Sequence, residues 1–228
     1  MRIATAGSRK PRGGSEAKSR SRNGQPGNDP AANQEQRTDR VDTRIAILDA
    51  TEQIMLKEGY CGVSSRKVAS AAGLKSQLLH YYFRSMDDLF IAVFQRLEDR
   101  FSEAFAHAMA SPRPIRELWA LNMDATSTRL IFEFNALASH QPTIRSLIAR
   151  SVRNDRVNLT AALTGFLKRS GKTTDQLPPK ILAFLLSALT RTLSADRTLG
   201  ATEAHDDVLA FVEAYIKQLE ETPIVDPN

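Results

Sequence analysis

The chain has 228 residues, of which 42% are hydrophobic and 25% are charged, and its formal net charge is +5 at pH 7. A chain of this length can bury a substantial core, as one large domain or two modest ones. Its longest apolar runs are six residues, whereas a membrane-spanning helix needs roughly 20, and the N-terminus lacks the apolar segment of a signal peptide. We therefore expect a cytoplasmic protein without a membrane partner.

The excess positive charge lies in residues 1–40, which hold nine Lys and Arg but only four Asp and Glu, while the rest of the chain holds 22 of each sign. The same segment has no aromatic residue but five of the eleven glycines. Such a segment buries too little apolar area to offset the entropy of ordering it. We expect a disordered basic tail, which either adds salt-sensitive attraction to DNA or is a solvated extension without a specific role.

Motifs for catalysis or metal binding are not visible in the sequence. The single cysteine, Cys61, excludes an intramolecular disulfide, and no histidine has a zinc-ligand spacing to another ligand type. A glycine-rich phosphate loop and a defensible Ser/His/Asp order are also missing. We predict no catalytic residue, no metal, no cofactor and no enzyme activity.

From about Val41 onward, apolar residues recur with the spacing of α-helices, and strand-like alternation never lasts more than a few positions. The first helix carries one apolar stripe and ends at Gly59, because glycine commonly follows the last turn of a helix. Ser85 precedes two first-turn carboxylates and therefore begins a later helix. The apolar stripe of that helix is Phe90, Phe94, Leu97, Phe101 and Phe105.

Prolines and glycines mark the ends of the other expected helices, which cover roughly residues 64–71, 75–81, 114–123, 125–139, 143–170, 179–198 and 202–221. We therefore predict an all-α fold with nine helices and no strand. Residues 41–90 form a three-helix N-terminal domain, and residues 91–222 form a larger helical bundle.

Residues 64–84 combine a sharp helical corner with charge of one sign. Ala69 is small enough for a close helix crossing, and Gly73 tolerates the positive φ of a tight turn. The segment has four basic residues and no acidic one. Its expected outward side chains are basic or hydrogen-bonding, as contacts with phosphates and base edges require: Arg66, Lys67, Lys75, Ser76, Gln77, His80 and Tyr81. The pattern favours a DNA-binding helix-turn-helix, although any α-α corner can contain a small residue and a glycine.

A family resemblance rests on the segments Ile47-Leu48-Asp49-Ala50, Gly59-Tyr60, Ser64-Ser65-Arg66, Val68-Ala69, Ala71-Ala72-Gly73-Leu74, Tyr82-Phe83 and Asp88-Leu89. In this order and spacing, over about residues 41–90, they resemble the DNA-binding domain of the TetR family of transcriptional regulators. The resemblance implies a homodimer whose two recognition helices enter successive major grooves of a palindromic operator. It further implies a small ligand in the C-terminal domain that releases the DNA.

The resemblance also implies residue roles. The start of the second helix contacts phosphate through Ser64, Ser65 and Arg66. The reading surface of the third helix comprises Lys75, Ser76, Gln77, His80, Tyr81 and Tyr82. The sequence departs from the family at Lys75, often a capping Ser, at His80, often Tyr, and at Met86, commonly a phosphate-contacting Lys. The last contact is therefore either missing or moved to Arg84.

Candidate ligand-binding residues lie in the C-terminal bundle. Trp119, Met123 and Phe132 are candidates to line an apolar cavity, although aromatic and Met residues at helical spacing are more often core. Asn135 and Asp155 lie within apolar stretches, where a buried amide or carboxylate needs a partner from the protein or from a ligand.

A structural ion pair is expected near the Pro142 turn. Glu133 precedes this turn and Arg145 follows it, and their charges are opposite. We predict that they pair with each other rather than with a ligand.

The last two expected helices are apolar around more than one face, so each must be covered on several sides. Pairing them across a two-fold axis into a four-helix bundle buries the surplus. A monomer in which both are simple core helices is the alternative.

Three functions remain open from the sequence. The leading one is a homodimeric, sequence-specific DNA-binding repressor controlled by an unknown small-molecule effector. The second is a dimeric DNA-binding protein without an effector. The third, a helical enzyme with a structural N-terminal corner, would require a catalytic constellation, and none is visible.

Overall fold

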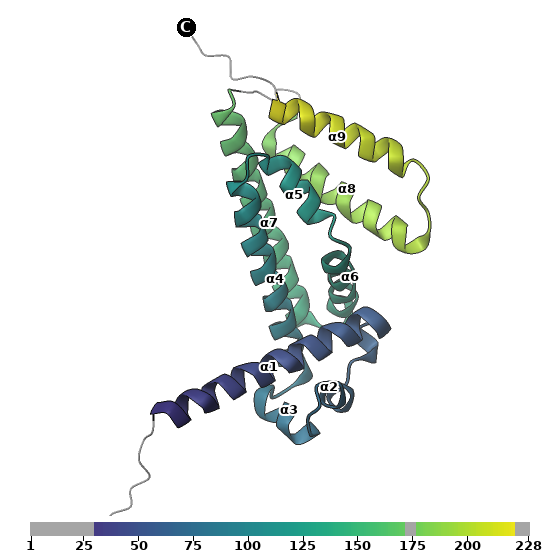
Figure 1. The fold of residues 1–228 in the computed structure, drawn as a ribbon. Coiled ribbons are helices and arrows are strands. Elements are labelled where there is room, and N and C mark those ends of the chain that lie inside the picture. Colours follow the sequence, from purple (N-terminus) through teal and green to yellow (C-terminus); the bar gives the residue numbers. More distant parts are fainter. Residues whose placement is uncertain (1–29, 172–176, 222–228) are drawn as a thin grey trace, which may run out of the picture. The chain divides into compact units, whose positions relative to one another are not determined.

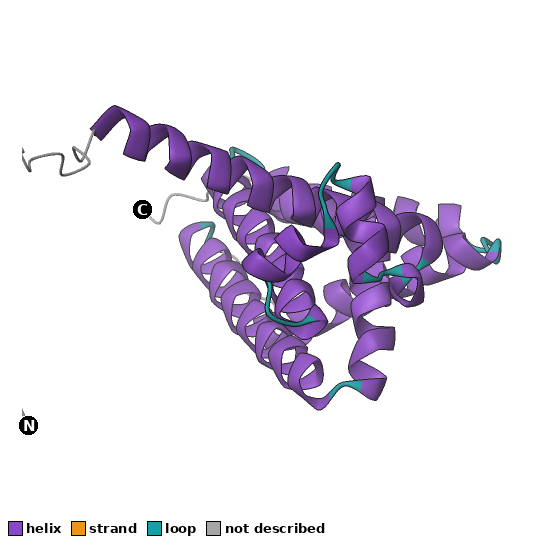
Figure 2. Ribbon diagram, turned by 90° about the horizontal axis from the view of Figure 1, so that it is seen from below, coloured by secondary structure: helices purple, strands orange, loops and turns teal. Residues whose placement is uncertain are grey.

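The computed structural model describes residues 30–171 and 177–221 of the chain. Within these ranges it contains nine α-helices, one short 3₁₀ helix and no strand, an all-helical architecture that is visible in Figure 2. The all-α prediction is confirmed. The short 3₁₀ helix is η1 (Tyr60–Gly62). The helices labelled in Figure 1 are α1 (Pro30–Glu58), α2 (Ser65–Ala71), α3 (Ser76–Tyr82), α4 (Met86–Ala110), α5 (Pro114–Asn122), α6 (Ala125–His140), α7 (Pro142–Arg169), α8 (Pro179–Leu199) and α9 (His205–Glu221).

The chain divides into two compact units, Met1–Arg40 and Val41–Asn228. In the first unit, residues 30–40 are helical and form the start of α1, whereas the sequence predicted disorder throughout 1–40. Pro30 at the helix start and the Ala, Gln and Glu that follow it suit the first turns of a helix without any apolar stripe. The rest of the predicted tail, residues 1–29, lies outside the described residues.

Within the second unit, one core cluster joins residues of α1, α2, α3, α4, α6 and α7. Its centre includes Phe94 and Phe134, both almost fully buried, whose rings meet edge to face at a centroid distance of 5.1 Å. Such aromatic pairs add stability beyond the apolar area that they bury. The cluster therefore connects the helices of the N-terminal corner directly to the first helices of the bundle.

A second core cluster joins α5, α7, α8 and α9, with Leu163 and Ile216 almost fully buried. A carboxylate from α9 also holds the start of α5, because Glu220 Oε1 accepts hydrogen bonds from the backbone N–H groups of Ile115 at 2.9 Å and Arg116 at 3.1 Å. These groups have no partner within their own helix, and a negative charge at a helix N-terminus is stabilising.

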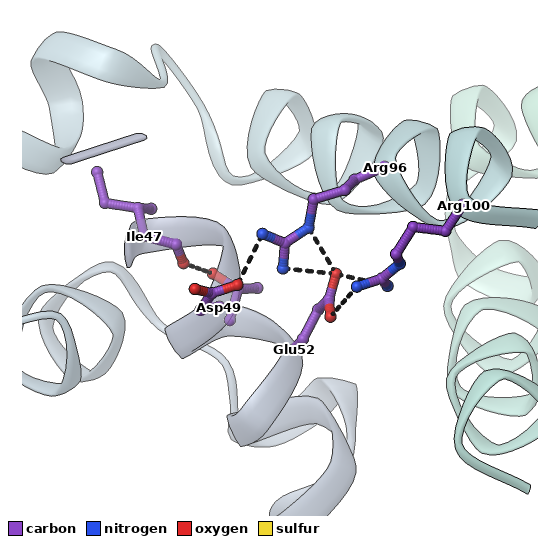
Figure 3. A network of polar contacts seen from close by, with 6 residues as sticks. Ile47, Asp49, Glu52, Arg96 and Arg100 are labelled. Carbon is purple, nitrogen blue, oxygen red and sulfur yellow. Dashed lines mark hydrogen bonds and ion pairs between the residues drawn. The ribbon is translucent and has the colours of Figure 1, made fainter. Parts of the chain in front are cut away.

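A charged network joins α1 to α4 (Figure 3). Glu52 of α1 is only 8% exposed, and its Oε1 lies 2.9 Å from Arg96 Nε and 3.0 Å from Arg100 Nη2. Arg96 Nη1 also lies 2.7 Å from the exposed carboxylate of Asp49. A buried carboxylate requires this kind of pairing, because its desolvation would otherwise be costly.

The predicted Glu133–Arg145 pair is wrong. Glu133 Oε2 instead accepts a hydrogen bond from the backbone N–H of Tyr60 at 2.8 Å. Arg145 donates from Nε to the carbonyl of Ala138 at 3.0 Å and from Nη2 to that of Ser139 at 2.9 Å. The last carbonyls of α6 lack partners within their helix, so they attract the guanidinium more effectively than a carboxylate that is already engaged.

In the network of Figure 3, Arg96 pairs with two carboxylates, the buried one of Glu52 and the exposed one of Asp49. We expect Glu52→Gln to lower the free energy of unfolding by about 3 kcal/mol, because it leaves two guanidinium groups without their buried partner. Asp49→Asn should cost less than about 1 kcal/mol, because Asp49 is solvated. Urea unfolding of both variants measures this difference, and equal costs would contradict the structural role of Glu52.

Candidate nucleic-acid interface and ligand pocket

The corner between α2 and α3 has the geometry that its sequence predicted. Ala69 is 1% exposed, and Gly73 adopts a φ of 69°. The backbone N–H of Leu74 closes the turn on the carbonyl of Ala69 at 2.8 Å. Gly73 is required by this left-handed backbone rather than by crowding, because a Cβ added there would meet nothing within 4 Å.

The two helices of the corner begin differently. Ser64 caps α2, with its side chain accepting from the backbone N–H of Lys67 at 3.4 Å. Lys75 occupies the equivalent position before α3 and makes no side-chain cap bond. The departure from the family's capping Ser therefore leaves the first N–H groups of α3 without a side-chain acceptor from the N-cap residue.

The outer face of the corner carries most of the side chains that the sequence assigned to DNA. Ser65 and Tyr82 are partly buried, and Tyr82 meets Tyr81 edge to face at 5.3 Å. Lys67 pairs with Glu58, whereas no ion pair involving the other basic residues of the corner occurs within the described ranges. The exposed members are Ser64, Arg66, Lys67, Lys75, Ser76, Gln77, His80, Tyr81 and Arg84.

A pocket of about 430 Å³ lies within the second unit, between α4, α6 and α7, with contributions from α5 and α8. Its volume is in the range of sites for small organic molecules. The α4 stripe predicted from the sequence forms one wall, since Phe94, Leu97, Phe101 and Phe105 all line the pocket. Phe90, the first residue of that stripe, lies in the core instead.

Two acidic side chains line this pocket, Glu98 of α4 and Asp155 of α7. Burial, and secondarily the negative charge of Glu98, raise the pKa of Asp155 to about 6. By surface area the Asp155 side chain is nonetheless exposed, so its desolvation is only partial. At neutral pH the carboxylate is therefore mostly ionised, although its surroundings destabilise the ionised form.

Two arginines also line the pocket. The guanidinium of Arg156 lies over the Phe184 ring at 4.9 Å from the centroid, and its buried Nε has no hydrogen-bond partner within the described ranges. Arg191 Nε donates to the carbonyl of Ser187 at 3.1 Å.

Of the five residues predicted for ligand binding, the structure brings Asn135 and Asp155 to the pocket. Trp119 and Met123 pack in the second core cluster instead, and Phe132 is partly buried outside the pocket lining. Within the described residues, no group of three or more His, Cys, Asp or Glu side chains is arranged to hold a metal ion, and no helix is long and apolar enough to cross a membrane.

The α2–α3 corner is similar in sequence to a domain of known proteins. A family model described as "Bacterial regulatory proteins, tetR family" matches residues 47–93, which cover the end of α1, all of α2 and α3, and the start of α4. Residues 47–93 are therefore similar to the N-terminal domain of the TetR family. The HTH-type transcriptional repressor NicS of Pseudomonas putida is 33% identical over 86 residues, which are 36% of this chain and 41% of the repressor.

Solved structures share the fold over most of the chain. GusR of Salmonella enterica is 17% identical with a TM-score of 0.63, and covers 79% of this chain and 96% of its own. A TetR transcription regulator from Haloarcula marismortui is 19% identical, also with a TM-score of 0.63, covering 78% of this chain and 98% of its own. At these identities the likeness establishes the fold, including a helical bundle after the TetR domain.

Glu98, Arg156 and Arg191 are pocket residues that the sequence interpretation missed. Glu98 lies four residues after Phe94 and three before Phe101, and is therefore an acid on an otherwise aromatic face of α4. The argument that selected Asn135 and Asp155, a polar residue within an apolar stretch, would have selected Glu98 as well. The arginines gave no such signal, because arginines recur along the exposed faces of α7 and α8.

The raised pKa of Asp155 has a consequence for stability. The folded chain holds this proton more tightly than the unfolded chain, so the stabilising contribution is present at low pH and is lost as the pH rises from 3.8 to about 6. Asp155→Asn removes the penalty, and we expect its melting temperature to exceed that of the wild type at pH 7 but to match it near pH 4. Thermal unfolding at both pH values tests this, with exposed Asp99→Asn as the control. A lower melting temperature for Asp155→Asn at pH 7 would contradict the assignment.

Proposed function

We propose that the protein is a homodimeric, sequence-specific DNA-binding transcriptional regulator. It acts as a repressor that leaves a palindromic operator when a small molecule occupies the pocket. The observation that carries the proposal is the outer face of the α2–α3 corner, built from a segment (64–84) without acidic residues, on which Arg66, Lys75, Gln77 and Arg84 are exposed. Cationic and amide side chains on a helical corner suit phosphate and base-edge contacts. The similarity to NicS, a transcriptional repressor, supports the direction of regulation.

Dimerisation is supported by the apolar surface of α8 and α9. Phe184 and Leu185 of α8 are 48% and 47% exposed, and Phe211 of α9 is 71% exposed. Exposed aromatic and aliphatic side chains on two consecutive helices are typical of an interface between identical subunits. Pairing of α8 and α9 with the same helices of a second copy forms a four-helix bundle and spaces two recognition helices on DNA.

Control by a small molecule is favoured over the effector-free alternative by the pocket itself. A cavity of about 430 Å³, with an aromatic wall and several polar side chains, is the kind of site that small ligands occupy. A bundle that served only to dimerise would gain stability by filling such a space.

Substitutions in the corner separate base reading from phosphate attraction. We expect Gln77→Ala to cost about 1–3 kcal/mol of binding free energy at one base pair of the selected operator, and little elsewhere. Arg66→Ala should weaken binding to all sequences and reduce the slope of log affinity against log salt by about 1.

The experiment first selects bound fragments from a genomic library with the purified full chain, and then measures affinities by fluorescence anisotropy at several salt concentrations. Lys168→Ala at the end of α7 is the control for removal of a positive charge outside the corner. If no duplex is preferred over random DNA, or if Arg66→Ala behaves like the control, the proposed function is wrong.

A single charge on the exposed face of α9 tests the dimer. Phe211→Glu places a carboxylate where the proposed interface buries an aromatic ring, so it should convert the dimer to a monomer and weaken operator binding. Sedimentation velocity measures the change in mass. Val41→Glu, at an apolar position of α1 that is 56% exposed, is the control and should leave the dimer intact. A wild-type monomer at micromolar concentration would refute the proposal.

A further inference from the structure

The two pocket carboxylates lack the partners that the structural carboxylates Glu52, Glu133 and Glu220 have. Glu52 has two guanidinium partners, Glu133 has a backbone N–H, and Glu220 has two. Glu98 and Asp155 have no hydrogen bond or ion pair within the parts of the chain that the structure describes. They instead face the same cavity with the same charge.

The positive groups of the pocket do not compensate them. Arg191 donates to the carbonyl of Ser187, and the guanidinium of Arg156 lies over the ring of Phe184 on α8, with its buried Nε left without a hydrogen-bond partner within the described residues. Burial first, and then the negative charge of Glu98, raise the pKa of Asp155 despite the two arginines in the pocket lining. The negative charge of the pocket that has no partner therefore lies at the two carboxylates, between α4 and α7.

A positive charge placed between two carboxylates relieves both their mutual repulsion and their desolvation. The adjacent wall of the pocket is aromatic, with Phe94, Phe101 and Phe105 from α4. Aromatic rings bind apolar groups and also attract cations. The arrangement thus offers one cationic subsite beside an apolar surface, within about 430 Å³.

We propose that the effector of this protein is an organic cation, an apolar or aromatic molecule with an ammonium group, and that Glu98 and Asp155 together bind that group. This inference rests on the proposed function of the pocket as the effector site. It names the chemical class of the ligand, which neither the fold nor the family determines.

Binding of such a cation depends on pH in a defined direction. Besides Asp155, the charged side chains that line the pocket are Glu98 of α4, Arg156 of α7 and Arg191 of α8. The two arginines stay charged between pH 5 and pH 7.5. The cation binds the ionised form of Asp155, so its affinity should fall as the pH drops through about 6. With a permanently charged quaternary ammonium as the probe, this change reports on the protein alone.

The test uses the full-length protein without DNA and isothermal titration calorimetry. The probes are benzyltrimethylammonium and, as an anion with a similar aromatic body, phenylacetate. At pH 7.5 we expect the cation to bind about tenfold more tightly than the anion. Asp155→Asn and Glu98→Gln should each weaken cation binding about fivefold or more, and Asp99→Asn, an exposed acid next to Glu98 in sequence, should not. The wild-type affinity should drop between pH 7.5 and pH 5, and the affinity of Asp155→Asn should not.

Several results would overturn the inference: no cation binding at millimolar concentration, equal or tighter binding of phenylacetate, or insensitivity to both pocket substitutions. Thermal unfolding of each variant shows that a lost affinity does not reflect a lost fold. Operator binding by the same preparations separates the two proposals. A protein that binds its operator but not the cation refutes only the ligand class, whereas one that binds no specific duplex refutes the proposed function.

Discussion

The ion pairing of Glu52 with Arg96 and Arg100 constrains how α1 and the bundle helix α4 are held together. It fixes α1 to α4 through a carboxylate that is 8% exposed, in an environment where an unpaired charge would be costly. The same stretch of α4 also lines the pocket, because Leu97, Glu98 and Phe101 alternate with these arginines around the helix. One helix therefore contacts the α1 network on one side and the ligand pocket on another.

Acidic residues of similar chemistry have opposite surroundings in this protein. The carboxylate of Glu52 has two guanidinium partners, and its pairing contributes to the fold. Asp155 lacks such partners, and burial together with Glu98 raises its pKa to about 6. A residue that would be more stable as an amide is typical of a site retained for binding rather than for folding. This contrast separates the structural carboxylate from the proposed ligand-binding one without any reference to relatives.

Local chemistry predicted the helices well, because caps and breakers act within a few residues. Ser85 forms a capping box with Asp88, Gly73 supplies the positive φ of the turn, and Gly200 ends α8 in the left-handed region. The predictions that were wrong depended on which sides of neighbouring helices face one another. Glu133 binds Tyr60 rather than Arg145, and Trp119 faces the second core rather than the pocket. The helix periodicity around Glu133 and Trp119 is compatible with either partner. Only the packing between helices decides which partner each side chain meets.

Three successive residues of α6 show how closely the pocket is linked to the corner. Glu133 accepts the backbone N–H of Tyr60 in η1, Phe134 packs against Phe94 of α4, and Asn135 lines the pocket. Gly59 next to Tyr60 has a φ of 75°, and a Cβ there would lie 3.1 Å from Glu133 Oε2, so this approach requires glycine. A ligand that fits only one arrangement of α4 and α6 would therefore act on the hydrogen bond between α6 and η1 as well as on the ring contact between α6 and α4. Such differential binding is the only means by which a ligand can shift the balance between two states of the corner.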